Sequence, residues 1–260
     1  LALIERFKLF ETKKDALELQ RAHLLADMGE FGKRNGIEFQ QDPAAVEIRY
    51  FDRVLTIGKK GKRTPYFDHN ENVLRMDVNV GPNILAHELA HATSFDQKTK
   101  TGGFLRFTSE GTEGNQSLTE GATMMVEFEL VPTKREDTRD VGDDLYDGYY
   151  WFTDLIRTEL EVERCDFLRA YYGQEPYPSK FEEKVRSRFG CTVDELSHLF
   201  LGYSDKAKEL MRKIVKGDAV KLSASNQGGL LDEYRRLSRI FPNIEVIEKT
   251  PRSAQENDID

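Results

Sequence analysis

The pattern of apolar and polar residues divides the chain into a helical start, a short sheet and a helical second half. Over residues 1–36, apolar side chains recur every three or four positions between charged ones, which predicts one or two amphipathic helices. Residues 46–51, 54–58 and 73–80 instead alternate apolar and polar side chains and are rich in β-branched and aromatic residues. We expect these three runs to be strands of a small antiparallel or mixed sheet.

Two helices are predicted after the sheet, on either side of a glycine-rich stretch. The first covers residues 83–95 and begins with Asn83, a favourable N-cap that follows a Gly-Pro turn. The second covers residues 117–130 and begins with Ser117 as its N-cap. Residues 101–116 between them predict a loop, either a flap over a cleft or a solvated connector.

The rest of the chain is predicted to be helical to about residue 241, starting with one long helix over residues 146–172. We therefore expect a single α+β domain that is mostly helical, with the small sheet placed before the first central helix. Its expected parts are a helical N-terminal segment over residues 1–36, a unit of sheet and helices over residues 46–131, a helical C-terminal subdomain over residues 145–241 and a flexible tail over residues 251–260.

Composition removes several classes of protein. Lys and Arg number 38 against 46 Asp and Glu, and this acidic excess argues against a nucleic-acid partner, which requires clustered positive charge. No apolar run approaches the roughly 20 residues of a membrane span, so we expect a soluble protein. We also expect a monomer. Cys165 and Cys191 have no metal-binding spacing, so any metal ion must be held by imidazole and carboxylate groups.

His87, Glu88 and His91 form a His-Glu-x-x-His motif on the first predicted central helix. Residues four apart lie on one helix face, so two imidazoles can bind one metal ion and Glu88 can reach a water bound there. Zinc suits this site because it binds neutral imidazole and lowers the pKa of its water, whose proton Glu88 would accept. The pattern arises by chance in roughly 1 of 100 chains of this composition, so two merely hydrogen-bonded histidines are the alternative.

A catalytic zinc site usually has a third protein ligand, and Glu120 is the strongest candidate. It lies among small and apolar residues near the start of the second central helix, where an unpaired carboxylate is costly to bury. The alternative is that Glu120 is the capping-box glutamate of that helix, three residues after Ser117. The rival carboxylate ligands are Asp96, Glu110, Glu113 and Glu127.

The motif and the segment around Glu120 resemble the gluzincins, the zinc metallopeptidases that include thermolysin and the zinc aminopeptidases. The segment Leu-Thr-Glu-Gly-Ala-Thr over residues 118–123 is similar to the Leu-Asn-Glu-Gly-Phe-Ala segment of the aminopeptidases. The resemblance implies a zincin-like fold with one Zn²⁺ ion. It implies His87, His91 and Glu120 as the metal ligands. The general base would be Glu88.

Two features depart from that family. Met124 stands where the glutamate helix of thermolysin carries an acidic residue, so the partner that orients a metal-bound imidazole is not identified. Residues 77–81 lack the exopeptidase motif of the aminopeptidases, which favours an endopeptidase.

The order of elements also resembles that of bacterial effector proteases that are injected into host cells, one of which cleaves actin. This resemblance implies a secreted effector that acts in the host cytosol, with host actin as its protein substrate. Without it, a cytoplasmic protein is expected.

A protease also needs a hydrogen-bond donor for the oxyanion that develops on the substrate, and Tyr149, Tyr150 and His198 are candidates. The aromatic run that holds the two tyrosines is more typical of core packing at the head of a helix. We further expect the strand over residues 73–80 to lie at the edge of the cleft and to pair with an extended substrate.

The sequence therefore predicts a zinc metalloendopeptidase that hydrolyses a peptide bond in a protein substrate. Two alternatives stay open: a non-catalytic zincin-like module that binds a partner or regulates gene expression, and a zinc hydrolase of non-peptide substrates. Glu88 favours catalysis, because a structural metal site has no use for a carboxylate beside its first ligand.

Overall fold

The computed structural model describes residues 2–52, 65–108, 111–132, 145–197, 219–224, 235, 238 and 243–248. These residues form an α+β fold, as the sequence predicted. The helices are α1 (Ala2–Asn35), the short 3₁₀ turn η1 (Pro43–Ala45), α2 (Pro82–Ser94), α3 (Gln116–Leu130), α4 (Leu145–Glu159), α5 (Arg164–Tyr171), α6 (Tyr177–Phe189) and α7 (Val193–Ser197). The strands are β1 (Glu47–Phe51), β2 (Tyr66–Asp68), β3 (Val73–Asp77), β4 (Phe95–Asp96), β5 (Thr101–Gly102), β6 (Leu105–Thr108), β7 (Gly111–Gly114), β8 (Val220–Ala224) and β9 (Ile244–Glu248).

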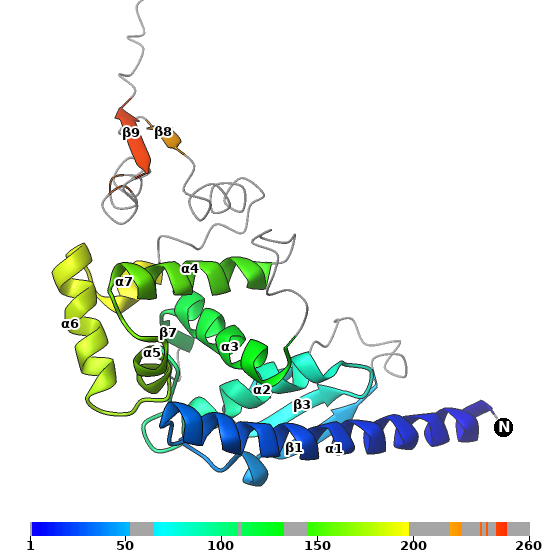
Figure 1. The fold of residues 1–260 in the computed structure, drawn as a ribbon. Coiled ribbons are helices and arrows are strands. Elements are labelled where there is room, and N and C mark those ends of the chain that lie inside the picture. Colours follow the sequence, from blue (N-terminus) through cyan, green and yellow to red (C-terminus); the bar gives the residue numbers. More distant parts are fainter. Residues whose placement is uncertain are drawn as a thin grey trace, which may run out of the picture.

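Helices α2 and α3 lie between α1 on one side and α4 on the other (Figure 1). The N-terminal segment is one continuous helix, which agrees with the prediction for residues 1–36. It ends at Gly36, whose φ of 61° lies in the left-handed region that glycine adopts without strain. A Cβ there would also lie 2.5 Å from the Arg169 guanidinium, so this end of α1 is closely packed on α5.

The first sheet is mixed, as predicted, but its order differs from the expected one. β3 is the central strand, parallel to β1 and antiparallel to β2. The prediction that residues 73–80 border the cleft is therefore wrong, because both sides of β3 are already paired. The N–H of Val78 likewise donates to the carbonyl oxygen of Phe51 at 2.9 Å. Among the described strands, β1 and β2 are the two edges of this sheet, and the three residues of β2 are too short a run to show alternation in the sequence.

Residues 101–116 are not a loop, contrary to the prediction. They contribute β5, β6 and β7, which join β4 in a four-stranded antiparallel sheet with the order β4-β5-β6-β7. The glycines that suggested a loop allow tight turns instead. Gly103 has a φ of 61°, and a Cβ there would lie 2.7 Å from the Tyr171 ring and 2.9 Å from the Thr119 methyl group. The short strands thus pack directly on the helices.

The long helix predicted over residues 146–172 is divided into α4 and α5. Between them Glu161 takes a left-handed φ of 49°. Arg157 stabilises the break, because its guanidinium donates to the carbonyl oxygen of Val162 at 2.8 Å and to Asp154 at 2.7 Å. A further difference is β8, which lies within the segment predicted to be helical up to residue 241 and pairs in parallel with β9.

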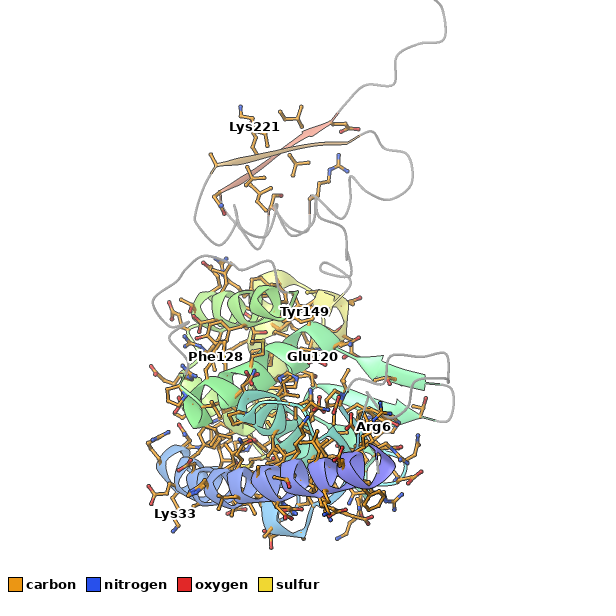
Figure 2. The ribbon with its side chains drawn as sticks, turned by 90° about the vertical axis from the view of Figure 1, so that its right-hand side faces the viewer. Arg6, Lys33, Glu120, Phe128, Tyr149 and Lys221 are labelled. Atoms are coloured by element: carbon orange, nitrogen blue, oxygen red, sulfur yellow. The ribbon has the colours of Figure 1, made fainter. Side chains whose placement is uncertain are left out.

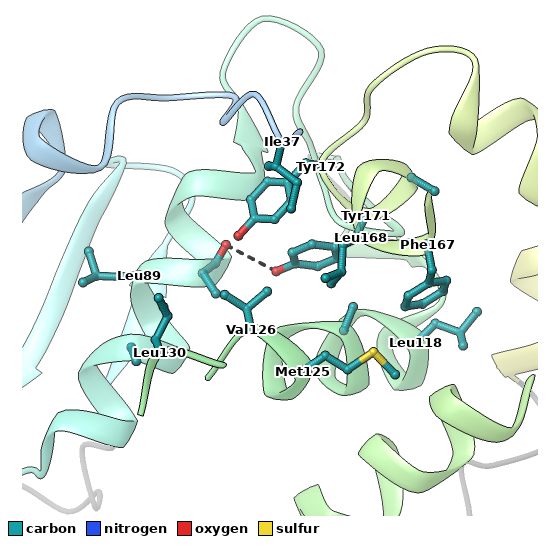
Figure 3. Packing of buried hydrophobic residues seen from close by; sticks show 14 of the residues in the cluster. Ile37, Leu89, Leu118, Met125, Val126, Leu130, Phe167, Leu168, Tyr171 and Tyr172 are labelled. Carbon is teal, nitrogen blue, oxygen red and sulfur yellow. Dashed lines mark hydrogen bonds between the residues drawn. The ribbon is translucent and has the colours of Figure 1, made fainter. Parts of the chain in front are cut away.

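The main core lies where α2, α3 and α5 meet (Figure 3). Leu89, Leu118, Val126 and Phe167 are almost completely buried there, and each such side chain stabilises the fold by about 1.5–3 kcal/mol. The hydroxyl group of Tyr171 donates to the carbonyl oxygen of Ala90 at 3.3 Å and so ties α5 to α2. The core therefore fixes α2 and α3 against each other.

Some predictions lie outside the described residues. These are the strand over residues 54–58, His198, Glu110 and the tail over residues 251–260. Among the helices that the structure describes, none has an apolar stretch long enough to cross a bilayer.

Gly121→Ala is expected to destabilise the protein by about 3 kcal/mol, because overpacking a close helix crossing forces the backbone apart. A Cβ at Gly121 would lie 2.0 Å from Thr153 Oγ1 and 2.4 Å from the Tyr149 carbonyl oxygen, so α3 and α4 cannot keep their approach. Urea unfolding measures the effect. Gly29→Ala in α1 is the control, since no atom would lie within 4 Å of its Cβ, and it should gain about 0.5–1 kcal/mol. Equal stabilities of the Gly121 variant and the wild type would contradict this packing.

Candidate metal centre

The His-Glu-x-x-His motif lies on α2, which packs between α1 and α3. The helix begins at Pro82, which suits a first helical turn because its missing N–H would have no partner there, and Gly81 is the N-cap. The prediction of Asn83 as N-cap is therefore wrong by two residues. Residues on most sides of α2 are buried, among them Leu85, Ala86, Leu89 and Ala90. His87 and His91 share the face that turns toward α3.

Helix α3 supplies the third side chain. Its N-cap is Asn115, whose side chain accepts a hydrogen bond from the Leu118 N–H at 2.9 Å, so Ser117 is already inside the helix. Glu120 consequently lies beyond the capping-box position, and the interpretation of Glu120 as a cap is wrong. Its carboxylate is directed at the two histidines of α2. In Figure 2, Glu120 lies on α3, between α4 above and α1 below.

Three ligand atoms converge between α2 and α3. Nε2 of His87 and Nε2 of His91 are 3.2 Å apart, and Oε2 of Glu120 lies 3.3 Å from the first and 3.4 Å from the second. Zinc–ligand bonds of about 2.0–2.1 Å at the tetrahedral angle place ligand atoms about 3.3–3.4 Å apart. His87, His91 and Glu120 therefore form a group that could bind a metal ion, at the spacing of a tetrahedral site.

The other ring nitrogens determine which atoms carry hydrogen. Nδ1 of His87 lies 3.1 Å from Oε2 of Glu127, an acceptor, so it carries the hydrogen. Nδ1 of His91 lies 3.3 Å from Oγ1 of Thr123, whose own hydrogen goes to the Thr119 carbonyl oxygen at 2.8 Å. We assign the Nδ1–H tautomer to both rings on this network.

In that tautomer both Nε2 atoms present lone pairs to the same point, and so does Glu120. Oε2 of Glu120 is buried and has no hydrogen-bond partner among the described residues. Leaving such an atom unpaired is costly, and a cation at the centre of the triangle satisfies all three groups at once. This is the observation that favours a metal ion over two histidines that are merely hydrogen-bonded.

The charges on and around His87, His91 and Glu120 also favour a bound cation. Burial alone would lower the pKa of His87, but its contacts with Glu120 and Glu127 outweigh burial and raise the pKa to about 10. Burial alone would raise the pKa of Glu120, and the two histidines overcome this and hold it well below its ordinary value. A divalent cation that is bound by neutral histidines supplies the same charge.

Glu88 is next to the first ligand and half-buried. Burial raises the pKa of its carboxyl group above the ordinary value. His91, His87 and a hydrogen bond from the backbone of Phe67 act in the opposite direction without cancelling that effect. A carboxylate with a raised pKa is a better proton acceptor, which suits the general-base role predicted for Glu88.

A cavity of about 550 Å³ opens over this group, and His87, Glu88, His91 and Glu120 all line it. Its walls come from β2 and the turn after it, the end of α2, β5 to β7 and the start of α3. No lysine or arginine is among the described residues that line it. The group is thus open to a ligand on one side and enclosed by helices on the other.

The structure does not bring the two candidate tyrosines into this cavity. Tyr149 is buried on α4, and Tyr150 packs edge-on against Phe128 with ring centroids 4.9 Å apart. Their packing agrees with the core interpretation, and Figure 2 shows Tyr149 on the helix beyond Glu120. Neither is used in the function proposed below.

The rival ligands that the structure describes lie elsewhere. Asp96 accepts hydrogen bonds from the Lys98 N–H and Thr99 in its own turn, and Glu113 is exposed on β7. Glu127 belongs to the site in another role, because it contacts Nδ1 of His87 rather than the point of convergence. It is the orienting carboxylate that the sequence left unidentified. A spacing of seven residues from Glu120, two turns along the same face of α3, is the signal that indicates it.

Two further contributions to the site were not predicted from the sequence. Tyr171, from α5, holds Thr123 with a hydroxyl contact of 2.8 Å and thus acts on His91 indirectly. His69 lines the cavity from the turn after β2. Nothing in the spacing of either residue connects it with the motif.

Compared with models of protein families, with curated proteins and with solved structures, the chain has no match.

Replacing Glu127 should weaken metal binding, because a metal-bound imidazole loses basicity and orientation when its partner is removed. We expect Glu127→Gln to reduce zinc affinity about 10-fold and Glu127→Ala up to about 100-fold. Competition with a chromophoric chelator measures the dissociation constant. Glu129→Gln is the matched control on the same helix, since Glu129 pairs with Arg34 and Arg164 instead, and it should bind zinc like the wild type. Equal affinities for all four proteins would show that the contact between Glu127 and His87 has no such role.

Proposed function

We propose that the chain is a zinc-dependent endopeptidase with a zincin-like fold, acting on a protein substrate. The observation that carries the proposal is the convergence of three lone pairs, from His87, His91 and Glu120, at tetrahedral spacing under an open cavity. The donor set of two imidazoles and one carboxylate is that of catalytic rather than structural zinc sites, which are usually closed by four protein ligands. Glu88 at the same cavity supports catalysis.

The residues divide the chemistry between them. A zinc ion held here would act as a Lewis acid that activates water and polarises a carbonyl group. Glu88 accepts the proton of the attacking water and delivers it to the amine that leaves when the C–N bond breaks. Glu127 and Thr123 keep the two imidazoles in the tautomer that faces the metal.

Strand β2 offers a place for an extended polypeptide. Among the described strands it is one of the two edges of the first sheet, and both Tyr66 and Phe67 line the cavity. The backbone N–H of Phe67 donates to Glu88 and therefore points away from β3. The side of β2 that is not paired with β3 thus lies next to the general base. A peptide that pairs with this edge would have its backbone next to His87, His91 and Glu120, which we call the metal group.

The Glu88→Gln variant is expected to lose activity by about 100- to 10,000-fold while it retains zinc, because a neutral amide cannot accept the proton. Two measurements check this. Metal analysis of the purified proteins should find one zinc per chain in both. A proteomic comparison of new N-termini in a lysate should find products of the wild type that the variant does not make. Purified actin, the substrate implied by the resemblance to effector proteases, is the first single protein to test.

A control distinguishes the general base from the ligands. His91→Ala should lose zinc together with activity, whereas Glu88→Gln should lose activity alone. A wild-type protein without stoichiometric zinc would refute the metal site. Zinc in the wild type without any new termini would support the non-catalytic module instead.

A further inference from the structure

One wall of the cavity is built from aromatic rings. Phe95 follows directly after α2, Phe107 lies on β6, and their ring centroids are 5.5 Å apart in an edge-to-face arrangement. His69 stacks on Phe107 at 4.1 Å with an interplanar angle of 28°, and Phe67 meets Phe95 edge-on at 5.4 Å. These four rings form a connected group, the ring wall, and all four residues line the cavity of the metal group.

The elements that hold the ring wall make it rigid. On β6, Leu105 and Phe107 lie two residues apart on one face of the strand, and both line the cavity. Opposite them, Gly102 leaves room for the rings, since a Cβ there would lie 3.3 Å from Phe107 and 3.4 Å from Phe95. Phe95 is almost completely buried and forms the floor, whereas Phe107 and His69 are half-buried.

The ring wall lies beside the path of a substrate. His87, His91 and Phe95 follow one another at intervals of four residues, and Phe95 comes directly after α2, so it lies about 6 Å beyond His91 along the helix axis. An extended chain advances about 3.3 Å per residue, which places the ring wall about two residues from the bond at the metal group. β2 leads into the same wall, because Phe67 belongs to the strand and His69 to the turn that follows it.

We propose that the ring wall is a substrate subsite that binds one large apolar side chain, aromatic in preference to aliphatic, of the polypeptide held along β2. The inference rests on the proposed function and adds the class of substrate. Stacked and edge-to-face rings favour a further aromatic ring over an aliphatic chain of similar size. No described lysine or arginine lines the cavity. Of its carboxylates, Glu88 and Glu120 lie at the metal group and Asp68 pairs with Arg75 at 3.2 Å, so the rings themselves offer packing rather than charge.

His69 contributes to this subsite as a ring. Burial lowers its pKa below the ordinary value, and Lys100 adds to this against the opposing effect of Asp68. The imidazole is therefore neutral at neutral pH and stacks on Phe107 as an aromatic surface. Its ring stacks on Phe107, so we expect His69 to contribute an aromatic surface rather than a proton to the subsite.

The cleavage profile tests the preference. New termini made in a lysate by the wild type, but not by Glu88→Gln, are aligned on the cleaved bond. We expect one position within four residues of that bond to be enriched in Phe, Tyr and Trp over Leu and Met. Enrichment at no such position, or enrichment in charged residues, would overturn the proposal.

Substitutions test the roles of His69 and Phe107 in the subsite. With a peptide that carries the preferred ring and a matched peptide that carries alanine there, His69→Ala and Phe107→Ala should each lower kcat/KM about 10-fold for the first peptide and leave the second unchanged. Arg106→Ala is the control, because Arg106 is the exposed neighbour of Phe107 on the opposite face of β6. His69→Phe should restore the preference. If His69→Phe is as impaired as His69→Ala on both peptides, the imidazole acts chemically and the subsite role of His69 is refuted.

A binding measurement separates this proposal from the proposed function. If the wild type makes no new termini, N-acetylphenylalanine amide and N-acetylalanine amide are titrated into the zinc-treated full chain, and the His69 ring signals are followed by NMR. A selective shift with the phenylalanine amide, lost in Phe107→Ala, would support the subsite even though the endopeptidase has failed. Equal effects of both amides would overturn it.

Discussion

The carboxylate of Glu120 lies between two imidazoles, and with both rings as Nδ1–H tautomers its buried Oε2 atom has no hydrogen-bond donor among the described residues. An acceptor buried in this way is tolerated only where a cation offsets the cost. The rest of the site follows from this constraint. Glu127 and Thr123 bind the outer nitrogens of the two rings and thereby direct both inner lone pairs at the same point as Glu120. The metal group is thus specified as much by the partners of the histidines as by the histidines themselves.

The fold brings α2 and α3 close together and covers the three side chains of the metal group on one side only. The small residues Ala86, Ala90 and Ala122 are completely buried at the centre, and Gly121 allows α4 to press on α3 from behind. Tyr171 spans the same region from α5, touching both the Ala90 carbonyl oxygen and Thr123. Packing on this side leaves the cavity of about 550 Å³ on the other, bounded by the two small sheets. The three side chains that could bind a metal ion therefore lie on closely packed helices and face open space on one side only.

Local pattern was a good guide to the helices and a poor one to the short strands. The one long helix α1 and the two central helices follow from apolar periodicity, because a helix repeats its pattern over several turns. β2 and β5 to β7 have at most four residues each, which is too few for a periodic pattern, and the glycines in and around β5 and β7 suggested a loop. The break between α4 and α5 was equally hidden, since it depends on Arg157 bonding across the gap.

The sequence by itself determined the motif of His87, Glu88 and His91 and the choice of Glu120, because helical spacing and an isolated acid in an apolar segment are local properties. Only the tertiary structure decided what Glu127 and His69 do. Glu127 was one of several possible ligands until the packing of α3 on α2 put it on the outer nitrogen of His87. His69 joined the cavity because β2 and β6 place its ring against Phe107. Such roles depend on contacts between residues 38 to 40 positions apart, which no periodicity records.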